Sequence, residues 1–132
     1  MVSAVETLGP DDSMEAAVAL ERRRKIRHIP IVENGVLVGI VTDRDLKRAM
    51  PSLLTGTDQQ TYERVTQTTP VKQIMTRSPM TIAPDAPLRE AVRILCDKKF
   101  GALPVVEGGA LVGIITETDV LRAFLEILDR DR

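Results

Sequence analysis

Apolar and β-branched residues gather in two pairs of short runs, and a glycine-containing dipeptide separates the two runs of each pair. The first pair occupies residues 29–33 and 36–42, and the second occupies residues 103–107 and 110–116. The dipeptides are Asn-Gly and Gly-Gly, which supply the positive φ angles that a two-residue hairpin turn requires. The pattern therefore predicts two β-hairpins.

A helical pattern precedes the second hairpin. Apolar residues recur at i, i+3, i+4, i+7 and i+8 over residues 87–98, which is typical of one face of a helix. These positions are Leu88, Ala91, Val92, Leu95 and Cys96. The stripe places Cys96 in the core, where free cysteines usually lie.

A weaker helical pattern precedes the first hairpin. Its apolar positions are Met14, Ala17 and Val18, and Asp12 stands three residues before Glu15 as in a capping box. We expect a helix here, capped by Asp12.

Helices are also expected after the hairpins. The second of them keeps one face apolar through Val120, Leu121, Phe124 and Leu128. A short strand is expected around residues 80–83. Residues 51–70 are polar and show no sustained period, which predicts a connection with at most one helical turn.

The chain contains one unit twice. Residues 28–49 align without a gap with residues 102–123, and 12 of the 22 aligned positions are identical. We expect a first repeat over 1–50 that lacks a counterpart of the lead-in 71–74, a connection over 51–70, and a second repeat over 71–132. Each half alone would bury only about 60% of its unfolded surface, so a shared core around a pseudo-two-fold axis is expected.

Composition narrows the class of protein. Of the 132 residues, 43% are apolar and 28% charged, as in globular domains, and the net charge of −1 gives no overall attraction to nucleic acid or to a membrane. Residues 1–9 do not resemble a secretory signal. One Cys and one His disfavour a disulfide or a structural zinc site, and we expect a cytoplasmic protein.

The strongest chemical candidate is the motif Gly-Ile-x-Thr-x-x-Asp, at residues 39–45 and again at 113–119. The Thr falls at a strand-to-helix junction, where its hydroxyl and the free amides of the first helical turn can meet phosphate. The Asp can accept hydrogen bonds from a vicinal diol such as ribose. Together they indicate a nucleotide, but Thr-x-x-Asp is also a near match to a capping box that needs no ligand. The two interpretations are about equally supported by these residues.

With the motif in its context, residues 27–45, 71–95 and 100–119 resemble a tandem pair of cystathionine-β-synthase (CBS) domains, called a Bateman module. The stretch 43–52 and the connection after it are most similar to stand-alone bacterial CBS pairs, including acetoin-utilisation proteins. The resemblance implies an α+β fold of two βαββα repeats, with small mixed sheets flanked by helices. It also implies a regulatory module that requires no cofactor and binds AMP, ADP, ATP, S-adenosylmethionine or another adenosyl ligand in two clefts between the repeats.

The resemblance also assigns residues to the two clefts. The first cleft would use His28, Ile40, Thr42, Asp45, Ala86, Phe100 and Gly101. The second would use Asp12, Ile26, Arg27, Ala102, Ile114, Thr116 and Asp119. In the family a basic residue at the place of His28 faces phosphate, whereas the second repeat has Ala102. The first cleft is therefore the better candidate for a charged nucleotide, and Asp12 would repel phosphate from the second.

Several function classes are weighed against this one. The basic run at residues 22–28 favours a solvated helix end over nucleic-acid binding, because the three aromatic residues of the chain offer no stacking platform. No reactive group indicates an enzyme. We expect a homodimer formed through the apolar faces within 88–96 and 120–128, with an unidentified protein effector. The alternative is a purely structural dimerisation or protein-interaction module without ligand.

Overall fold

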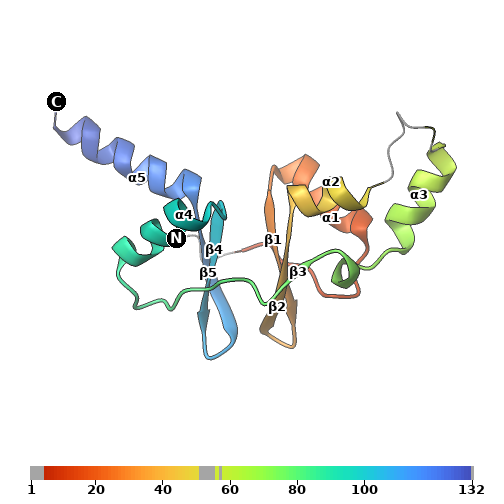
Figure 1. Cartoon of the computed structure of the whole chain (residues 1–132), viewed down its shortest axis with the longest axis horizontal. Helices are drawn as coiled ribbons and strands as arrows, with labels where there is room; N and C mark the ends of the chain where they lie inside the picture. The colour runs from red at the N-terminus through yellow and green to blue at the C-terminus, as the bar shows by residue number, and fades with distance from the viewer. Residues whose placement is uncertain (1–4, 51–55, 57, 132) are drawn as a thin grey trace. The chain divides into compact units, whose positions relative to one another are not determined.

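The structure is a computed structural model that describes residues 5–50, 56 and 58–131. The chain divides into two compact units. One comprises Glu6–Pro79, and the other comprises residues 80–131 together with Val5. Both units are mixed α+β, and Figure 1 shows a β-hairpin with flanking helices in each.

The unit Glu6–Pro79 contains the first predicted hairpin. In chain order its elements are α1 (Met14–Arg24), β1 (His28–Glu33), β2 (Val36–Thr42), α2 (Asp43–Ala49), α3 (Gln59–Thr68), a 3₁₀ turn (Val71–Gln73) and β3 (Thr76–Arg77). β2 pairs antiparallel with β1 on one side and with the short β3 on the other.

The unit of residues 80–131 contains the second predicted hairpin. Its elements are α4 (Leu88–Lys98), β4 (Ala102–Glu107), β5 (Ala110–Thr116) and α5 (Glu117–Arg130). β4 pairs antiparallel with β5 in the same register as β1 with β2. Both predicted hairpins and the helices around them are confirmed.

The hairpin turns adopt the predicted backbone. Asn34 and Gly35 have φ angles of 52° and 81°, and Gly108 and Gly109 have 58° and 87°. Two consecutive positive φ angles match the twist of the flanking strands. Each hairpin also has a register shift in its first strand, between Ile31 and Val32 and at the corresponding place in β4, which the sequence did not reveal.

A single residue continues each sheet beyond its outer strand. The amide of Leu8 donates to Pro30 O at 3.1 Å, and the amide of Val32 donates to Leu8 O at 2.9 Å. Ile82 makes the same pair of bonds with Pro104 O and the amide of Val106. Proline lacks an amide proton, so β1 and β4 fit this edge, which uses only the proline's carbonyl. The strand expected around residues 80–83 is this one bridge at Ile82.

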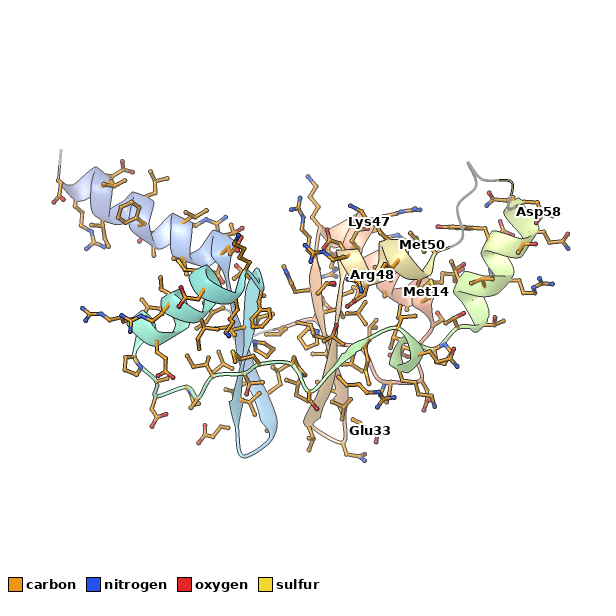
Figure 2. The ribbon with its side chains drawn as sticks, viewed as in Figure 1. Met14, Glu33, Lys47, Arg48, Met50 and Asp58 are labelled. Atoms are coloured by element: carbon orange, nitrogen blue, oxygen red, sulfur yellow. The ribbon has the colours of Figure 1, made fainter. Side chains whose placement is uncertain are left out.

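Each unit has its own apolar core. In the unit Glu6–Pro79 the core lies between α1, the hairpin, α2 and the 3₁₀ turn, and Figure 2 labels one member, Met14. Its buried residues are Met14, Ala17, Val18, Ile29, Ile31, Val41, Leu46 and Val71. In the other unit the buried core residues are Ile82, Ala91, Leu95, Leu103 and Val105. The predicted stripe of α1 is thus confirmed as core, despite its weakness.

The predicted stripe of α4 is wrong at its ends. Cys96 is exposed, and Leu88 is 62% exposed. The buried positions are Ala91 and Leu95, with Ile94 packed beside them. Ile94 lies on the opposite side of Ala91 and Leu95 from Cys96, so the face in contact with the core is rotated away from the cysteine.

The predicted cap of α1 is also wrong. Ser13 is the N-cap, and its side chain accepts a hydrogen bond from the amide of Ala16. Asp12 instead accepts from the amide of Gly9 at 2.7 Å and so closes the turn before the helix. Ser and Asp are equally good N-caps, so sequence could not choose between neighbouring positions.

The connection is more helical than the sequence predicted. α3 has ten residues, and the Asp58 side chain accepts from the amide of Thr61 at 2.7 Å as its N-cap. Hydrogen bonds from Thr61 lower the pKa of Asp58. Thr66 is buried, and the Tyr62 hydroxyl contacts Met50 Sδ at 3.4 Å. The prediction of at most one turn is therefore wrong. Residues 51–55 and 57 of the connection lie outside the described residues.

The segment after α3 is held on the first hairpin unit. The amide of Met14 donates to Thr69 O at 2.7 Å, and the amide of Val71 donates to Asp12 O at 2.8 Å. Lys72 forms an ion pair with Asp11, with Nζ and Oδ1 2.9 Å apart. The lead-in expected for the second repeat therefore belongs to the compact unit of the first hairpin.

Gly39 is where this segment comes closest to β2. A Cβ added to Gly39 would overlap the Met75 side chain and lie 3.0 Å from Thr76 O. Because Gly39 has no side chain, Met75 and Thr76 of the same chain can pack directly against β2.

Gly39→Ala is expected to lower the free energy of unfolding by about 1–3 kcal/mol, because Met75 and the β3 backbone must shift. Urea denaturation measures this. Gly9→Ala is the matched control, since its Cβ would meet its nearest atom at 3.6 Å, an ordinary contact. If Gly39→Ala unfolds at the wild-type urea midpoint, the expected overlap is absent. The same follows if the penalties of Gly39→Ala and Met75→Ala are fully additive in the double variant.

Candidate functional site

The Thr and Asp of the repeated motif meet at the junction between a strand and a helix. Thr42 is the last residue of β2 and the N-cap of α2. Its Oγ1 accepts from the amide of Asp45 at 3.1 Å, and Asp45 Oδ2 accepts from the amide of Thr42 at 3.0 Å. Thr116 and Asp119 repeat both bonds at 3.1 Å where β5 meets α5. Both copies are therefore complete capping boxes.

The backbone carbonyl of the residue before each hairpin accepts a hydrogen bond at the same junction. The amide of Asp43 donates to Arg27 O at 3.1 Å, and His28 lies opposite Thr42 in the strand register. In the other unit the amide of Glu117 donates to Gly101 O at 2.9 Å. Ala102 there lies opposite Thr116. In each unit the Thr and the Asp thus lie at one end of the hairpin, together with His28 in the first unit and Ala102 in the second.

The two Asp residues differ in their surroundings. Asp45 is only 9% exposed, and Thr76 Oγ1 from β3 lies 3.4 and 3.5 Å from its two carboxylate oxygens. Asp119 is less buried, and its described partners are those of the cap alone. No buried side-chain nitrogen or oxygen among the described residues lacks a hydrogen-bond partner.

A buried isoleucine lies near each cap. Ile40 and Ile114 are each 7% exposed and lie opposite Pro30 and Pro104 in the register. Each Ile precedes its Thr by two residues, so both side chains lie on the same face of the strand. Each junction therefore has a buried apolar side chain near its hydroxyl and carboxylate groups.

Each of the two predicted sets of site residues is divided between the two units. The first predicted set has His28, Ile40, Thr42 and Asp45 in one unit and Ala86, Phe100 and Gly101 in the other. The second has Ala102, Ile114, Thr116 and Asp119 in one unit and Asp12, Ile26 and Arg27 in the other. The structure brings together the members that share a hairpin, and the clefts that combine both units stay a prediction.

The predicted site residues outside the hairpins occupy varied surroundings. Phe100 is 45% exposed, Asp12 and Arg27 are exposed, and Ala86 and Ile26 are half-buried. Ala86 belongs to a turn before α4, where its amide donates to Ala83 O at 3.1 Å.

Sequence analysis missed Thr76, the side chain that reaches Asp45 from outside the motif. A signal for it was present, because a strand glycine such as Gly39 implies the close approach of another group. Nothing in the local pattern identified residues 75–77 as that group. Among the described residues, no cluster of three potential metal ligands occurs, and no helix combines the length and apolarity needed to cross a membrane.

Comparison with solved structures shows the same fold in several CBS proteins. A putative acetoin utilization protein (AcuB) from Vibrio cholerae is 33% identical with a TM-score of 0.80, over 98% of this chain and 89% of that one. CBSX2 in complex with AMP is 32% identical with a TM-score of 0.75, over 94% and 90%. The CBS domain pair of protein MJ0100, in complex with 5-methylthioadenosine and S-adenosyl-L-methionine, is 27% identical with a TM-score of 0.73, over 92% of each chain.

Sequence comparison gives the same result. Inosine-5'-monophosphate dehydrogenase from Korarchaeum cryptofilum is 36% identical over 121 residues, which is 91% of this chain but only 22% of that enzyme. The CBS domain-containing protein YhcV from Bacillus subtilis is 31% identical over 120 residues, 91% of this chain and 79% of the relative. The family model of the CBS domain matches residues 1–52 and 71–126. The chain therefore belongs to the CBS domain family, with one match in each repeat.

Proposed function

We propose that this protein is a non-enzymatic regulatory module that binds an adenosyl ligand. The observation that supports the proposal is the pairing of Thr with Asp at the first turn of a helix, next to a buried Ile, in both units. Solved CBS pairs of the same fold hold AMP, 5-methylthioadenosine and S-adenosyl-L-methionine. The ligand classes proposed are AMP, ADP, ATP and S-adenosylmethionine, with no cofactor required.

The capping boxes leave the groups that a nucleotide needs. Thr42 Oγ1 accepts one hydrogen bond in the cap, and its hydroxyl proton remains to be donated to a phosphate oxygen. A carboxylate offers about four acceptor positions, and Asp45 uses one for the amide of Thr42 and another for the Thr76 hydroxyl. Phosphate at the Thr and ribose at the Asp are therefore compatible with the caps.

The two proposed clefts differ in charge. The first combines His28, Ile40, Thr42 and Asp45 with Ala86, Phe100 and Gly101. The second combines Ala102, Ile114, Thr116 and Asp119 with Asp12, Ile26 and Arg27. An imidazole can supply a positive charge or a hydrogen-bond donor to phosphate, whereas the methyl group of Ala102 supplies neither. We expect the first cleft to bind the more highly charged ligand.

Regulation requires a ligand whose affinity differs between two conformations of the module. In this proposal the repeats are residues 1–50 and 71–132, joined by the connection 51–70, and a change between them reaches a protein effector. We place the protein in the cytoplasm.

The alternative function is a structural dimerisation or protein-interaction module without ligand. The observation in its favour is that each Thr and each Asp already has a complete capping role. Ligand binding and cap stability therefore need separate tests.

The first test is calorimetry and thermal shift with AMP, ADP, ATP and S-adenosylmethionine. One adenosyl ligand is expected to stabilise the wild type, by about 2.7 kcal/mol at a concentration 100 times its Kd. His28→Ala is expected to weaken the binding of a phosphorylated ligand, because His28 lies opposite Thr42 at the candidate phosphate position.

Asp45→Asn tests the first cleft, and Asp119→Asn is the matched variant for the second cleft. Loss of binding in Asp45→Asn with retention in Asp119→Asn assigns the ligand to the first cleft, and the reverse pattern assigns it to the second. No heat and no stabilisation with any of the four compounds at millimolar concentration would contradict the proposal and favour the structural module.

The second test concerns the caps themselves. Asp119→Ala is expected to cost about 1 kcal/mol of unfolding free energy as the loss of a half-buried cap. Asp45→Ala is expected to cost more, because the Asp45 carboxylate is buried and is lost together with its contact to Thr76. Urea denaturation without ligand measures both, and equal penalties would show that Thr76 adds nothing to the cap.

The third test concerns the proposed homodimer. Five large apolar residues of α5 are 48–67% exposed, namely Leu121, Phe124, Leu125, Ile127 and Leu128. Sedimentation velocity is expected to show a dimer for the wild type and a monomer for Leu121→Glu/Phe124→Glu, because two charges would be buried without partners. A charge-matched control is Thr118→Glu/Arg122→Gln on the same helix. A monomeric wild type would contradict this assignment of α5.

A further inference from the structure

Basic side chains gather on two helices of the unit Glu6–Pro79, α1 and α2. They lie at the C-terminal end of α1, just before β1, and along α2. We call them the basic surface: Arg22, Arg23, Arg24, Lys25, Arg27, Arg44, Lys47 and Arg48, all of which are exposed.

The two parts of this surface are held together. α1 and α2 pack against each other, and the amide of Asp43 donates to Arg27 O at 3.1 Å. α2 buries Asp45 and Leu46, so its three basic residues occupy the opposite side of the helix. Figure 2 labels two of them, Lys47 and Arg48, on α2 above the hairpin.

Most of these charges have no ionic partner within the described residues. Arg24 pairs with Glu6, with Nη1 and Oε1 2.7 Å apart. The other seven form no ion pair with a described carboxylate. An unpaired guanidinium keeps its donors available for carboxylate or phosphate.

The second repeat serves as an internal control, because it has the same elements without the charge. Residues 21–28 and 43–49 hold eight basic and three acidic residues, whereas the aligned residues 95–102 and 117–123 hold three and three. The positions of Arg22, Arg23 and Arg27 are taken there by Cys, Asp and Gly. The fold therefore does not require the charges.

The helix dipole explains only part of the pattern. Cations in the last turn of α1 are favoured by the dipole, and they would occur there without a partner. Arg44 lies in the first turn of α2, where a cation is disfavoured. The aligned residue of α5 is Thr118. The helix dipole therefore does not account for Arg44.

The surroundings favour carboxylates over other anions. None of the exposed large apolar residues belongs to α1 or α2, so nothing there would insert into a lipid surface. No aromatic residue lies on these helices to stack on bases. Outside the basic surface the chain has 10 basic and 19 acidic residues, which would repel an extended polyanion such as duplex DNA.

We propose that the basic surface of the unit Glu6–Pro79 docks an acidic segment of a protein partner. Six of its eight residues are arginines, whose planar guanidinium groups match carboxylates in a bidentate geometry. This goes beyond the proposed function, since the docking needs no nucleotide and does not depend on the Thr and Asp side chains.

Fluorescence anisotropy of a labelled Asp/Glu-rich peptide of about twelve residues, at ~50 mM salt without nucleotide, tests the proposal. Arg23→Gln/Arg44→Gln/Arg48→Gln is expected to weaken binding at least about tenfold, since three charges are lost. Arg89→Gln/Arg93→Gln/Lys98→Gln removes the same charge from exposed positions of α4 and is expected to change binding less than about twofold.

Duplex DNA of similar charge and phosphatidylserine vesicles are measured beside the peptide. The proposal is overturned if the peptide does not bind, if both triple variants lose binding equally, or if DNA or vesicles bind more tightly. Circular dichroism checks that the variants stay folded, and Arg44→Gln alone, with a loss above about twofold expected, replaces the triple variant if helix is lost. A failure to bind adenosyl ligands would leave this result unchanged.

Discussion

Each unit is organised around a hairpin of only two long strands, and such a hairpin is marginal by itself in water. The structure meets this constraint in the same way twice. A helix covers one face, and a single bridge at Leu8 or Ile82 continues the outer edge beyond the proline. The next helix starts directly where the second strand ends, so Thr42 and Thr116 are strand end and N-cap at once. The candidate site lies where it does because no loop separates these elements.

The capping box gives the site its geometry before any ligand arrives. The cap fixes the side chains of Thr42 and Asp45 relative to the first turn of α2, and neither side chain uses all of its hydrogen-bonding capacity in the cap. Such preorganisation removes part of the entropic cost of ordering these groups on binding. The structural and the ligand-binding interpretations therefore describe one arrangement, and the cap alone does not argue against a ligand.

Sequence predicted best what depends on neighbouring residues. The turn dipeptides located both hairpins, and Thr-x-x-Asp located both caps. The errors arose where tertiary packing decides. Cys96 fits the helical stripe but lies on the side turned from the core, α3 has too short an apolar stripe to be seen, and the approach of Thr76 to Asp45 joins residues 31 positions apart. Only Gly39 gave a local sign of that approach.

The differences between the repeats are as informative as their likeness. Positions that the fold requires are the same in both, as at the turn glycine, the Thr and the Asp. Where the repeats diverge on exposed helix surfaces, folding cannot be the reason, because the same elements form with either residue. Lys47 of α2 aligns with Leu121 of α5, so one surface is cationic and the other apolar. Solvent-exposed cations and exposed leucines suit different partners. The duplicated fold thus presents two chemically distinct surfaces on equivalent helices.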